Sequence, residues 1–283
     1  MNSNVAIITG AASGLGLEIA LDLLSMNRPS QVAADVRRLT LSQRGGRKED
    51  QSLVTSAATL DRWVHGPNAR PKSWGCGLPM DRIIVGVSRR PPTDERWKQA
   101  ASAGKAHHVS GDVSNPATTR DAFDQALRLG RLDLLVNCAG QGVFGSAGSF
   151  TRADVDAVLS ANLIGTILFS EQALALFKSQ GGTIVNVLST AAQVARANES
   201  LYCAAKWGAR GYTESLRLEA KGTPVKVVAV YPGGMRTRFW QDATGHKTDP
   251  STFMSPADVA RILVKILIEN VSVCVSDIVI NRK

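Results

Sequence analysis

Three residues in the second half of the chain have the types and the spacing of a proton-transfer site. Tyr202 and Lys206 lie four residues apart in a helical pattern, and Ser189 precedes Tyr202 by thirteen residues. Residues four apart share a helix face, so the Lys206 ammonium is expected near the Tyr202 phenol, where it would favour the ionised form. A phenol with an ordinary pKa of about 10 could then exchange protons nearer neutral pH. Ser189, expected at the carboxyl end of a strand, would present its hydroxyl to the same substrate oxygen.

A glycine-rich loop near the start of the chain is a candidate nucleotide site. Residues 5–9 are typical of a short buried strand, and the amphipathic run 17–26 is typical of a helix. Gly10, Gly14 and Gly16 lie in or beside the loop between them. Glycines let the backbone approach a pyrophosphate, and a helix amino terminus offers unpaired N–H groups and a positive dipole end. Strand, glycine loop and helix together indicate a dinucleotide-binding site.

Alternating strand and helix patterns continue along the chain. Strands are expected at residues 5–9, 83–88, 106–110, 132–137, 183–189, 225–231 and 273–280. Helices are expected at residues 17–26, 116–129, 152–179, 200–220 and 256–269. The alternation predicts an α/β fold, a Rossmann-like, doubly wound parallel sheet of about seven strands with helices on both faces. We expect a single domain over residues 1–283, with ligands at the carboxyl ends of the strands.

Together these features resemble the short-chain dehydrogenase/reductase family. Residues 9–16 are similar to the family's T-G-x-x-x-G-x-G loop, and residues 137–140 to its N-x-A-G motif. Asp112-Val113 resembles the pair that meets the adenine, and residues 232–237 resemble the P-G-x-x-x-T segment at the nicotinamide end. The resemblance implies cofactor contacts from Thr9, Gly10, Ser13, Gly14, Leu15, Gly16, Asp112, Val113, Asn137, Ala139, Gly140, Tyr202, Lys206, Pro232, Gly233 and Thr237.

The resemblance also implies a role for each of four catalytic residues. Tyr202 would protonate a carbonyl oxygen during reduction, and Lys206 would lower the Tyr202 pKa and bind the nicotinamide ribose. Ser189 would hydrogen-bond the reacting oxygen, and Asn162 would hold a proton-relay water. The cofactor supplies the hydride. The expected function is reversible reduction of a ketone or aldehyde. The alternative is a non-catalytic redox sensor of the same fold, although such proteins commonly lose catalytic residues that this chain keeps.

Residues 28–80 do not fit the family's spacing. Deleting them would join Asn27 to Asp81 and restore ordinary distances on both sides. The segment lacks the periodicity of a packed element, so we interpret it as a disordered or irregular insertion. The alternative is untranslated sequence retained in a gene prediction. An insertion could prevent folding, but closing a longer surface loop costs only about 0.6 kcal/mol per doubling of its length.

The identity of the second strand decides the cofactor. If residues 83–88 form it, Arg89 and Arg90 lie where an adenosine 2′-phosphate would bind, which favours NADP. If residues 32–34 form it, Asp35 would accept hydrogen bonds from an unphosphorylated ribose, which favours NAD. The helical pattern that follows Arg90 favours the first arrangement. We therefore expect NADP, with NAD as the less favoured cofactor.

Composition argues against several other classes of function. Lysine and arginine exceed aspartate and glutamate by five over residues 28–80, so most of the net charge of +9 lies there, and we expect no nucleic-acid partner.

The first strand leaves no room for a signal peptide, and no apolar stretch approaches the roughly 20 residues that span a bilayer. We expect a cytoplasmic protein without a membrane partner. The four scattered cysteines indicate no metal site. A homodimer or homotetramer is expected by analogy with the family.

The segment 237–253 is expected to form a mobile flap over the substrate. Its aromatic residues could line an apolar pocket, and residues 191–199 would form the opposite wall. Arg196 and Arg238 leave room for an acidic substrate. No pattern identifies the small-molecule carbonyl or alcohol substrate itself. The aromatic candidates are Phe239, Trp240 and Phe253.

Overall fold

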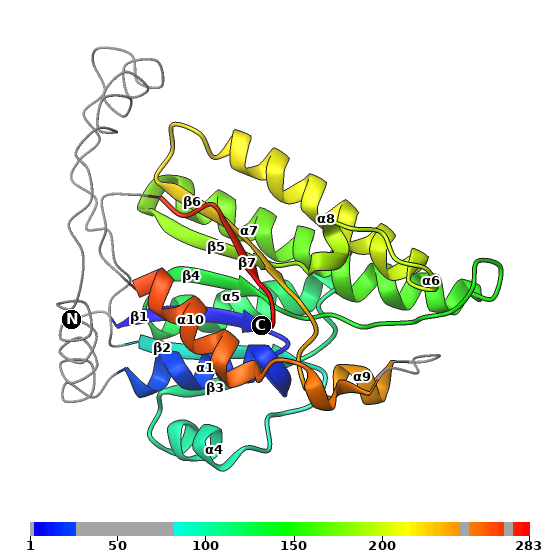
Figure 1. The fold of residues 1–283 in the computed structure, drawn as a ribbon. Helices are drawn as coiled ribbons and strands as arrows, with labels where there is room; N and C mark the ends of the chain where they lie inside the picture. The colour runs from blue at the N-terminus through cyan, green and yellow to red at the C-terminus, as the bar shows by residue number, and fades with distance from the viewer. Residues whose placement is uncertain (1–2, 27–81, 244–248, 269–273) are drawn as a thin grey trace, which may run out of the picture.

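A computed structural model of the protein describes residues 3–26, 82–243, 249–268 and 274–283. Its sheet consists of β1 (Asn4–Thr9), β2 (Arg82–Ser88), β3 (Ala106–Ser110), β4 (Arg131–Asn137), β5 (Gly182–Val187), β6 (Val225–Pro232) and β7 (Asp277–Ile280). These strands pair in parallel in the order β3-β2-β1-β4-β5-β6-β7 (Figure 1). The strand order reverses between β1 and β4, which is the point where open α/β sheets bind their ligands.

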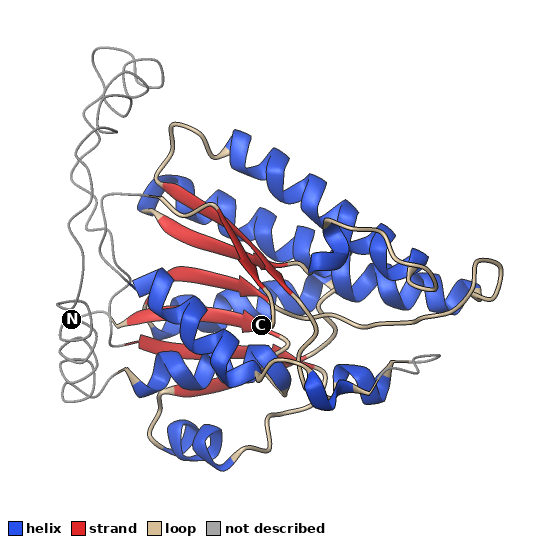
Figure 2. Cartoon of the chain, viewed as in Figure 1, coloured by secondary structure: helices blue, strands red, loops and turns tan. Residues whose placement is uncertain are grey.

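Helices cover both faces of this sheet (Figure 2). They are α1 (Gly14–Ser25), α4 (Glu95–Ser102), α5 (Pro116–Leu129), α6 (Arg152–Leu159), α7 (Gly165–Gln180), α8 (Ser200–Glu219), α9 (Phe239–Asp242) and α10 (Pro256–Ile268). A π-helical turn (Ser160–Ile164) joins α6 to α7, and 3₁₀ turns occupy Thr190–Ala192 and Pro250–Thr252. The predicted α/β fold with a seven-stranded parallel sheet is therefore confirmed.

Alternate residues of β1 point into two separate cores. Ala6 and Ile8 pack with residues of α1 and α10, whereas Val5 and Ile7 pack with residues of α5 and α7. All four side chains are fully buried. This alternation follows from the two-residue period of a strand, and a strand buried on both faces carries apolar residues at every position. The continuous apolar run at residues 5–8 is thus explained by helices on both sides.

The strand beside β1 begins at Arg82. β2 lies between β1 and β3, with Val5 opposite Ile83 and Ile84 opposite Ala106. The Arg82 guanidinium is buried and pairs with the Asp133 carboxylate at 2.7 Å. Residues 83–88 are therefore confirmed as the second strand of the described sheet. The competing strand at residues 32–34, its Asp35 and the proposed insertion at 28–80 lie outside the described residues.

One helix expected over residues 152–179 contains a break. The π-helical turn places the Gly165 N–H on the Ser160 carbonyl, five residues back instead of four. The cause lies in Asn162, whose side-chain amide donates to the Val158 carbonyl at 2.8 Å. An α-helical N–H at Asn162 would use that same carbonyl. A side chain that competes with the backbone produces this kind of irregularity.

The stretch Arg152–Gln180 is long and apolar enough to cross a membrane by length and composition. The expectation that no apolar stretch approaches this length is therefore wrong for these residues. In the structure, however, α7 lies on the sheet against β4 and β5. Its Phe169, Ala173 and Phe177 are fully buried in the core. The packing of α7 against the sheet accounts for part of this apolar character.

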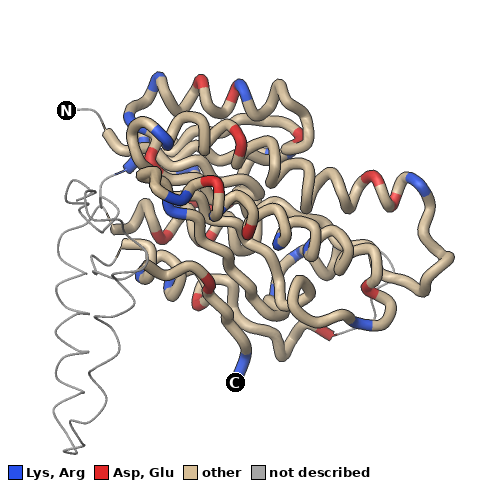
Figure 3. The backbone as a smooth tube through the Cα atoms, turned by 90° about the horizontal axis from the view of Figure 1, so that it is seen from above, with Lys and Arg blue, Asp and Glu red and all other residues tan. Residues whose placement is uncertain are grey.

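Basic and acidic residues are interspersed along the helices that Figure 3 shows. Several are neighbours on one helix, such as Arg152 with Asp156 and Arg210 with Glu214. Such mixed surfaces lack the single-signed patch that a nucleic-acid site uses. The described surface therefore adds nothing in favour of nucleic-acid binding.

Candidate active site

Ser189 lies two residues beyond the end of β5. Its hydroxyl accepts a hydrogen bond from the Ala191 N–H at 3.1 Å and so caps the 3₁₀ turn that follows. The same side chain is hydrogen-bonded to Tyr202, which comes from the first turn of α8. The strand predicted to run to Ser189 ends at Val187 instead, because the chain turns there into the 3₁₀ turn. This turn directs the Ser189 hydroxyl toward α8.

Lys206 is buried one turn further along α8. Its side chain is 4% exposed, and its ammonium donates a hydrogen bond to the Val187 carbonyl at 3.1 Å. The ammonium lies 5.8 Å from the centre of the Tyr202 ring. Burial lowers the pKa of Lys206 to about 8, and Cys138 opposes part of this change. The expected approach of Lys206 to Tyr202 is therefore present in the structure.

The pKa of Tyr202 is raised, whereas the sequence predicted that it would be lowered. Burial raises it above its ordinary value, while the hydrogen bond with Ser189 and the charge of Arg196 act in the opposite sense. The carboxylate of Glu199 adds to the rise. Desolvation of the phenolate thus outweighs the hydrogen bond and the positive charge of Arg196. The protein's own side chains keep the Tyr202 phenol protonated at neutral pH, and the predicted lowering is not found.

Asn162 faces the same region from the π-helical turn. Its amide nitrogen donates to the carbonyls of Gln141 and Val158, at 2.7 and 2.8 Å. Its side-chain oxygen is buried and has no hydrogen-bond partner among the described residues. A Cβ placed at Gly140 would lie 2.8 Å from this oxygen and 3.8 Å from the Lys206 ammonium. A small space bordered by an unpaired acceptor and an ammonium suits an ordered water molecule.

The glycine loop lies against the end of β4. Gly10 has a φ of +71°, and a Cβ there would lie 2.9 Å from the Ala139 backbone. A Cβ at Gly16 would lie 2.5 Å from the Gly10 carbonyl oxygen. The Thr9 hydroxyl accepts the N–H groups of Cys138 and Ala139 at 3.0 and 3.1 Å. Only glycine allows this tight turn at the start of α1, where backbone N–H groups face outward.

The remaining residues of the loop have mixed roles. Ser13 is exposed and precedes α1 without a side-chain hydrogen bond, so its hydroxyl is available to a ligand. Leu15 is buried in the core, which leaves only its backbone to face the loop. The Thr237 methyl group lies 3.2 Å from a Cβ placed at Gly14. The Pro232-to-Thr237 segment therefore closes over the glycine loop from the side of β6.

Arg89 and Arg90 follow directly after β2, at the same edge of the sheet. Both side chains are exposed, and neither forms an ion pair with a carboxylate in the described parts of the chain.

Asp112, at the end of β3, accepts hydrogen bonds from the Ser114 N–H and hydroxyl. Burial works to raise the pKa of Asp112, but these bonds and the charge of Arg89 lower it below its ordinary value. Asn115, not Asp112, caps α5.

Two residues assigned to the cofactor by motif are buried in the core. Asn137 donates to Ser170 and Asn186 at 2.9 Å each, and Asn186 donates to Thr213 at 3.0 Å. This chain of polar side chains joins β4, α7, β5 and α8 inside the protein. Val113 is likewise buried, against Gly165. The Asn137 side chain therefore holds the strands together, and a cofactor contact would have to come from neighbouring backbone.

The sequence of the chain matches the short chain dehydrogenase family over residues 80–248. The protein belongs to this family. The sepiapterin reductase of Chlorobaculum tepidum is 32% identical over 174 residues, which are 61% of this chain and 70% of that protein. The 3-ketodihydrosphingosine reductase of Bacteroides thetaiotaomicron is 30% identical over 159 residues, 56% of each protein. The match thus spans little more than half of the length of the Bacteroides protein.

Solved structures extend the likeness to the whole chain. A short-chain dehydrogenase/reductase from Vibrio parahaemolyticus superposes with a TM-score of 0.68 at 26% identity, covering 98% of this chain and 96% of that one. An alcohol dehydrogenase from the archaeon Thermococcus sibiricus gives a TM-score of 0.67 at 18% identity, which supports the fold alone. The chain is thus an oxidoreductase of the short-chain dehydrogenase family, whose fold binds a nicotinamide dinucleotide.

The short-chain dehydrogenase fold here carries an aromatic cluster that the motifs do not reveal. Phe144, in the loop after β4, lies edge-on to Tyr202 with ring centres 5.6 Å apart and stacks on Trp240 at 5.8 Å. Phe239 lies 5.6 Å from Tyr202, and Trp240 lies 5.1 Å from Phe253. Of the three aromatic residues expected in the flap, Phe239 thus packs on Tyr202, and Trp240 and Phe253 extend the cluster away from it. Phe144 was missed, and its only signal is an aromatic residue within a glycine-rich loop.

Two apolar side chains are exposed on α8 and on the π-helical turn. Trp207 is 46% exposed, and the Arg210 guanidinium lies 5.6 Å from the centre of its ring. Ile164, in the π-helical turn, is exposed as well.

Proposed function

We propose that this short-chain dehydrogenase reduces a ketone or aldehyde with NADPH, reversibly, using Tyr202 as the general acid or base. The observation that carries the proposal is the convergence of Ser189, Tyr202, Lys206 and Asn162 beside the glycine loop. These side chains come from the turn after β5, from α8 and from the π-helical turn, and the Lys206 ammonium lies 5.8 Å from the centre of the Tyr202 ring. The names of the two curated relatives, both reductases, support the direction of reduction.

The proton for reduction would come from the Tyr202 phenol. Because burial raises the pKa of Tyr202, the phenol is protonated at neutral pH, which is the form that can donate to a carbonyl oxygen. Ser189 is positioned to donate a hydrogen bond to the same oxygen. A bound nicotinamide cofactor would supply the hydride. Oxidation of an alcohol requires the phenolate, which desolvation disfavours.

Lys206 and Asn162 would resupply Tyr202 with a proton after it has protonated the substrate oxygen. The ammonium of Lys206, with its pKa of about 8, is charged at neutral pH and lies close to Tyr202. Its proton could be replaced through water held by the unpaired oxygen of Asn162. Gly140 leaves room for that water, since a side chain there would fill the gap between Asn162 and Lys206. The proposed proton relay therefore runs from the Tyr202 phenol through the Lys206 ammonium to a water molecule at Asn162.

The cofactor would lie across the carboxyl ends of β1, β2, β4 and β6. The cradle at Gly10 and Gly16 admits no side chain, which suits a pyrophosphate close to the backbone. Arg89 and Arg90 support NADP over NAD, because exposed guanidinium groups without carboxylate partners can pair with a 2′-phosphate. We propose NADP as the cofactor on this ground, with NAD as the weaker ligand.

We also propose that the protein is a cytoplasmic homo-oligomer. The exposed Trp207 and Ile164, on α8 and the π-helical turn, support an interface there. Sedimentation of the purified protein tests the assembly. A monomer at micromolar concentration would contradict it, and Trp207→Glu should shift an oligomer toward smaller species.

The reductase proposal is tested by following the absorbance of reduced nicotinamide with a panel of ketones and aldehydes. Oxidation of NADPH that depends on a carbonyl compound is the expected result, with NADH giving a lower kcat/KM. Melting curves with each cofactor report binding independently of turnover, because a ligand of the native state raises Tm. A Tm that neither cofactor changes, together with no turnover, would contradict the proposal.

A further inference from the structure

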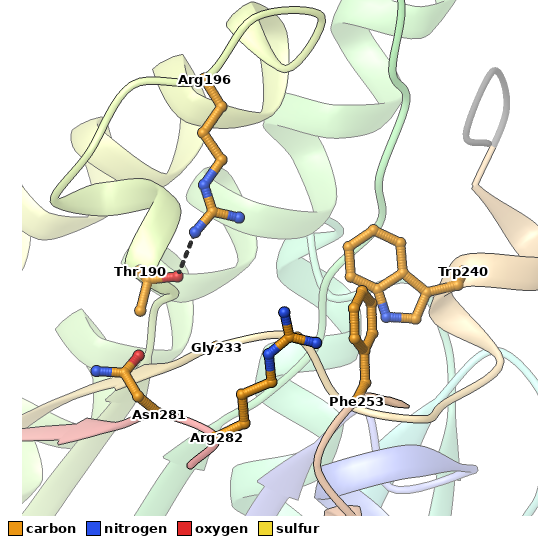
Figure 4. A pocket seen from close by; sticks show the side chains of 8 residues that line it. Thr190, Arg196, Gly233, Trp240, Phe253, Asn281 and Arg282 are labelled. Carbon is orange, nitrogen blue, oxygen red and sulfur yellow. Dashed lines mark hydrogen bonds between the residues drawn. The ribbon is translucent and has the colours of Figure 1, made fainter. Parts of the chain in front are cut away.

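A cavity of about 200 Å³ opens beside the catalytic serine, on the outer side of the aromatic cluster. Its walls come from the loops after β5, β6 and β7 and from the flap (Figure 4). Thr190 and Arg196 form one side, Asn281 and Arg282 form the other, and Trp240 and Phe253 close one end. Glycine backbone after β6 forms its floor. The cavity thus combines an aromatic wall with two guanidinium groups.

Arg196 and Arg282 point into this space from opposite sides (Figure 4). Arg196 donates to the Thr190 hydroxyl at 3.0 Å, and Arg282 donates to the Thr252 hydroxyl at 3.0 Å. The Arg282 guanidinium also lies 5.9 Å from the centre of the Phe253 ring. All these partners are neutral, and neither arginine forms an ion pair with a carboxylate among the described residues. Each guanidinium has five N–H donors, so most of them remain available.

The cavity adjoins the reaction site. Thr190 directly follows Ser189, which is hydrogen-bonded to Tyr202, and the charge of Arg196 acts on the Tyr202 pKa. On the other side, Trp240 stacks on Phe144, which contacts the Tyr202 ring. Trp240 therefore borders the cavity and also contacts the ring that packs on the phenol. A substrate whose carbonyl reaches Ser189 and Tyr202 would extend its far end toward the two arginines.

We propose that Arg196 and Arg282 bind an anionic group of the substrate, so that the enzyme prefers carbonyl compounds bearing a carboxylate or a phosphate. Two like charges facing one cavity repel each other, and an anion between them would remove that repulsion. The planar guanidinium fork matches both anions with paired hydrogen bonds. Trp240 and Phe253 would hold an apolar or aromatic segment between the anion and the carbonyl. This inference rests on the proposed reductase function.

The sequence suggested Arg196 and Arg238 for an acidic substrate, but the cavity holds Arg196 and Arg282. Arg196 lines the cavity as expected, but Arg238 precedes α9 and is not among the cavity residues. Arg282, close to the carboxyl end of the chain, takes its place because β7 ends beside β6 at this edge of the sheet. No local pattern marks Arg282 in the sequence. Its role depends on the sheet bringing the last residues next to the flap.

The test compares three aryl ketones with NADPH: 4-acetylbenzoate, its methyl ester and 4-acetylphenyl phosphate. The expected result is that at least one anion has a kcat/KM about tenfold or more above that of the ester, the size of one charge-assisted hydrogen bond. Arg196→Gln and Arg282→Gln should each reduce this ratio about tenfold. Arg128→Gln, the same change of charge on the exposed face of α5, should leave the ratio as it is in the wild type. The benzoate and the phosphate distinguish the two kinds of anion.

Equal kcat/KM values for the anions and the ester would overturn the anion site, while turnover of the ester would still support the reductase. A ratio insensitive to both glutamine variants would overturn it as well. Benzoate binding, measured by calorimetry on the cofactor-bound protein, needs no turnover. If no ketone is reduced but benzoate binds and both glutamine variants weaken it about tenfold, the anion site stands and the reductase proposal fails.

Discussion

The ammonium of Lys206 lies 5.8 Å from the centre of the Tyr202 ring while it donates a hydrogen bond to the Val187 carbonyl. The helix α8 supplies both residues, and the end of β5 supplies the carbonyl. The distance between the two side chains is therefore determined by how α8 packs on the sheet. Burial acts on both groups in the same way, because it favours the neutral form of each: it raises the pKa of Tyr202 and lowers that of Lys206.

Burial of Lys206 should make stability depend on pH in a defined window. Its pKa is about 8 in the folded protein against about 10.4 in an unfolded chain. Between these values the unfolded chain binds a proton that the native protein does not, so stability rises with pH. Below about pH 8 both states are protonated and the full cost of burying the charge is present. The difference in Tm between wild type and Lys206→Met should therefore change from pH 8 to pH 10, in favour of the wild type.

This comparison cancels other groups that titrate in the same range, such as tyrosines and cysteines. Lys206→Met is the matched variant, since methionine fills a similar volume without a charge. At pH 7 the methionine variant should be at least as stable as the wild type, although inactive. A pH-independent difference in Tm would show that Lys206 keeps its ordinary pKa in the folded protein.

Cofactor preference should depend on the two arginines after β2. Arg89→Ala and Arg90→Ala are each expected to raise the Kd for NADPH about tenfold, because each would remove a charge-assisted contact with the 2′-phosphate. The Kd for NADH should stay close to its wild-type value. Fluorescence titration with both cofactors measures the change, and Arg128→Ala serves as a control for net charge. Equal losses for NADPH and NADH would remove the argument for NADP.

Thr9 should contribute to stability through its hydroxyl. Thr9→Val keeps the shape but removes the acceptor for the Cys138 and Ala139 N–H groups. Leaving these two donors unpaired is expected to lower the free energy of unfolding by about 2 to 3 kcal/mol. Thr9→Ser keeps the acceptor and loses one methyl group, with a cost of about 1 kcal/mol or less. Urea denaturation distinguishes the two, and a serine variant as unstable as the valine variant would contradict the hydrogen-bonding role.

Deletion of residues 28–80 should leave the described fold intact. The strands and helices that surround the candidate site all lie outside this segment. Joining Asn27 to Asp81 would connect the end of α1 to β2 by about three residues, a length common between a helix and a strand in such folds. The shortened protein is expected to melt cooperatively, with NADPH raising its Tm. A shortened protein that does not fold would show that the segment is required and is not an insertion.

The elements were predictable because their apolar patterns are strong. The run at residues 5–9 marks one strand, and the strand at Arg82–Ser88 follows from its spacing to Asp112. The proximity of Tyr202 and Lys206 was predictable because residues four apart share a helix face. These properties are local, so a single sequence is enough to reveal them.

The remaining features depend on contacts between distant segments. The Asn162 amide, in the π-helical turn, also reaches the carbonyl of Gln141, which follows another strand. The raised pKa of Tyr202 reflects its burial, and the rings of Phe144 and Phe239, from two distant segments, pack against it. Arg282 reaches the substrate cavity because β7 lies beside β6. None of these relationships leaves a pattern in neighbouring residues.

Replacement of Tyr202 by phenylalanine tests the central claim most directly. Phenylalanine keeps the ring that packs against Phe144 and Phe239 and removes only the hydroxyl. For a carbonyl substrate that the wild type reduces with NADPH, kcat should fall by about 10²–10⁴, the usual contribution of a general acid. NADPH should still raise the Tm of the variant, which shows that the fold and the cofactor site remain. Undiminished turnover in Tyr202→Phe would contradict the mechanism.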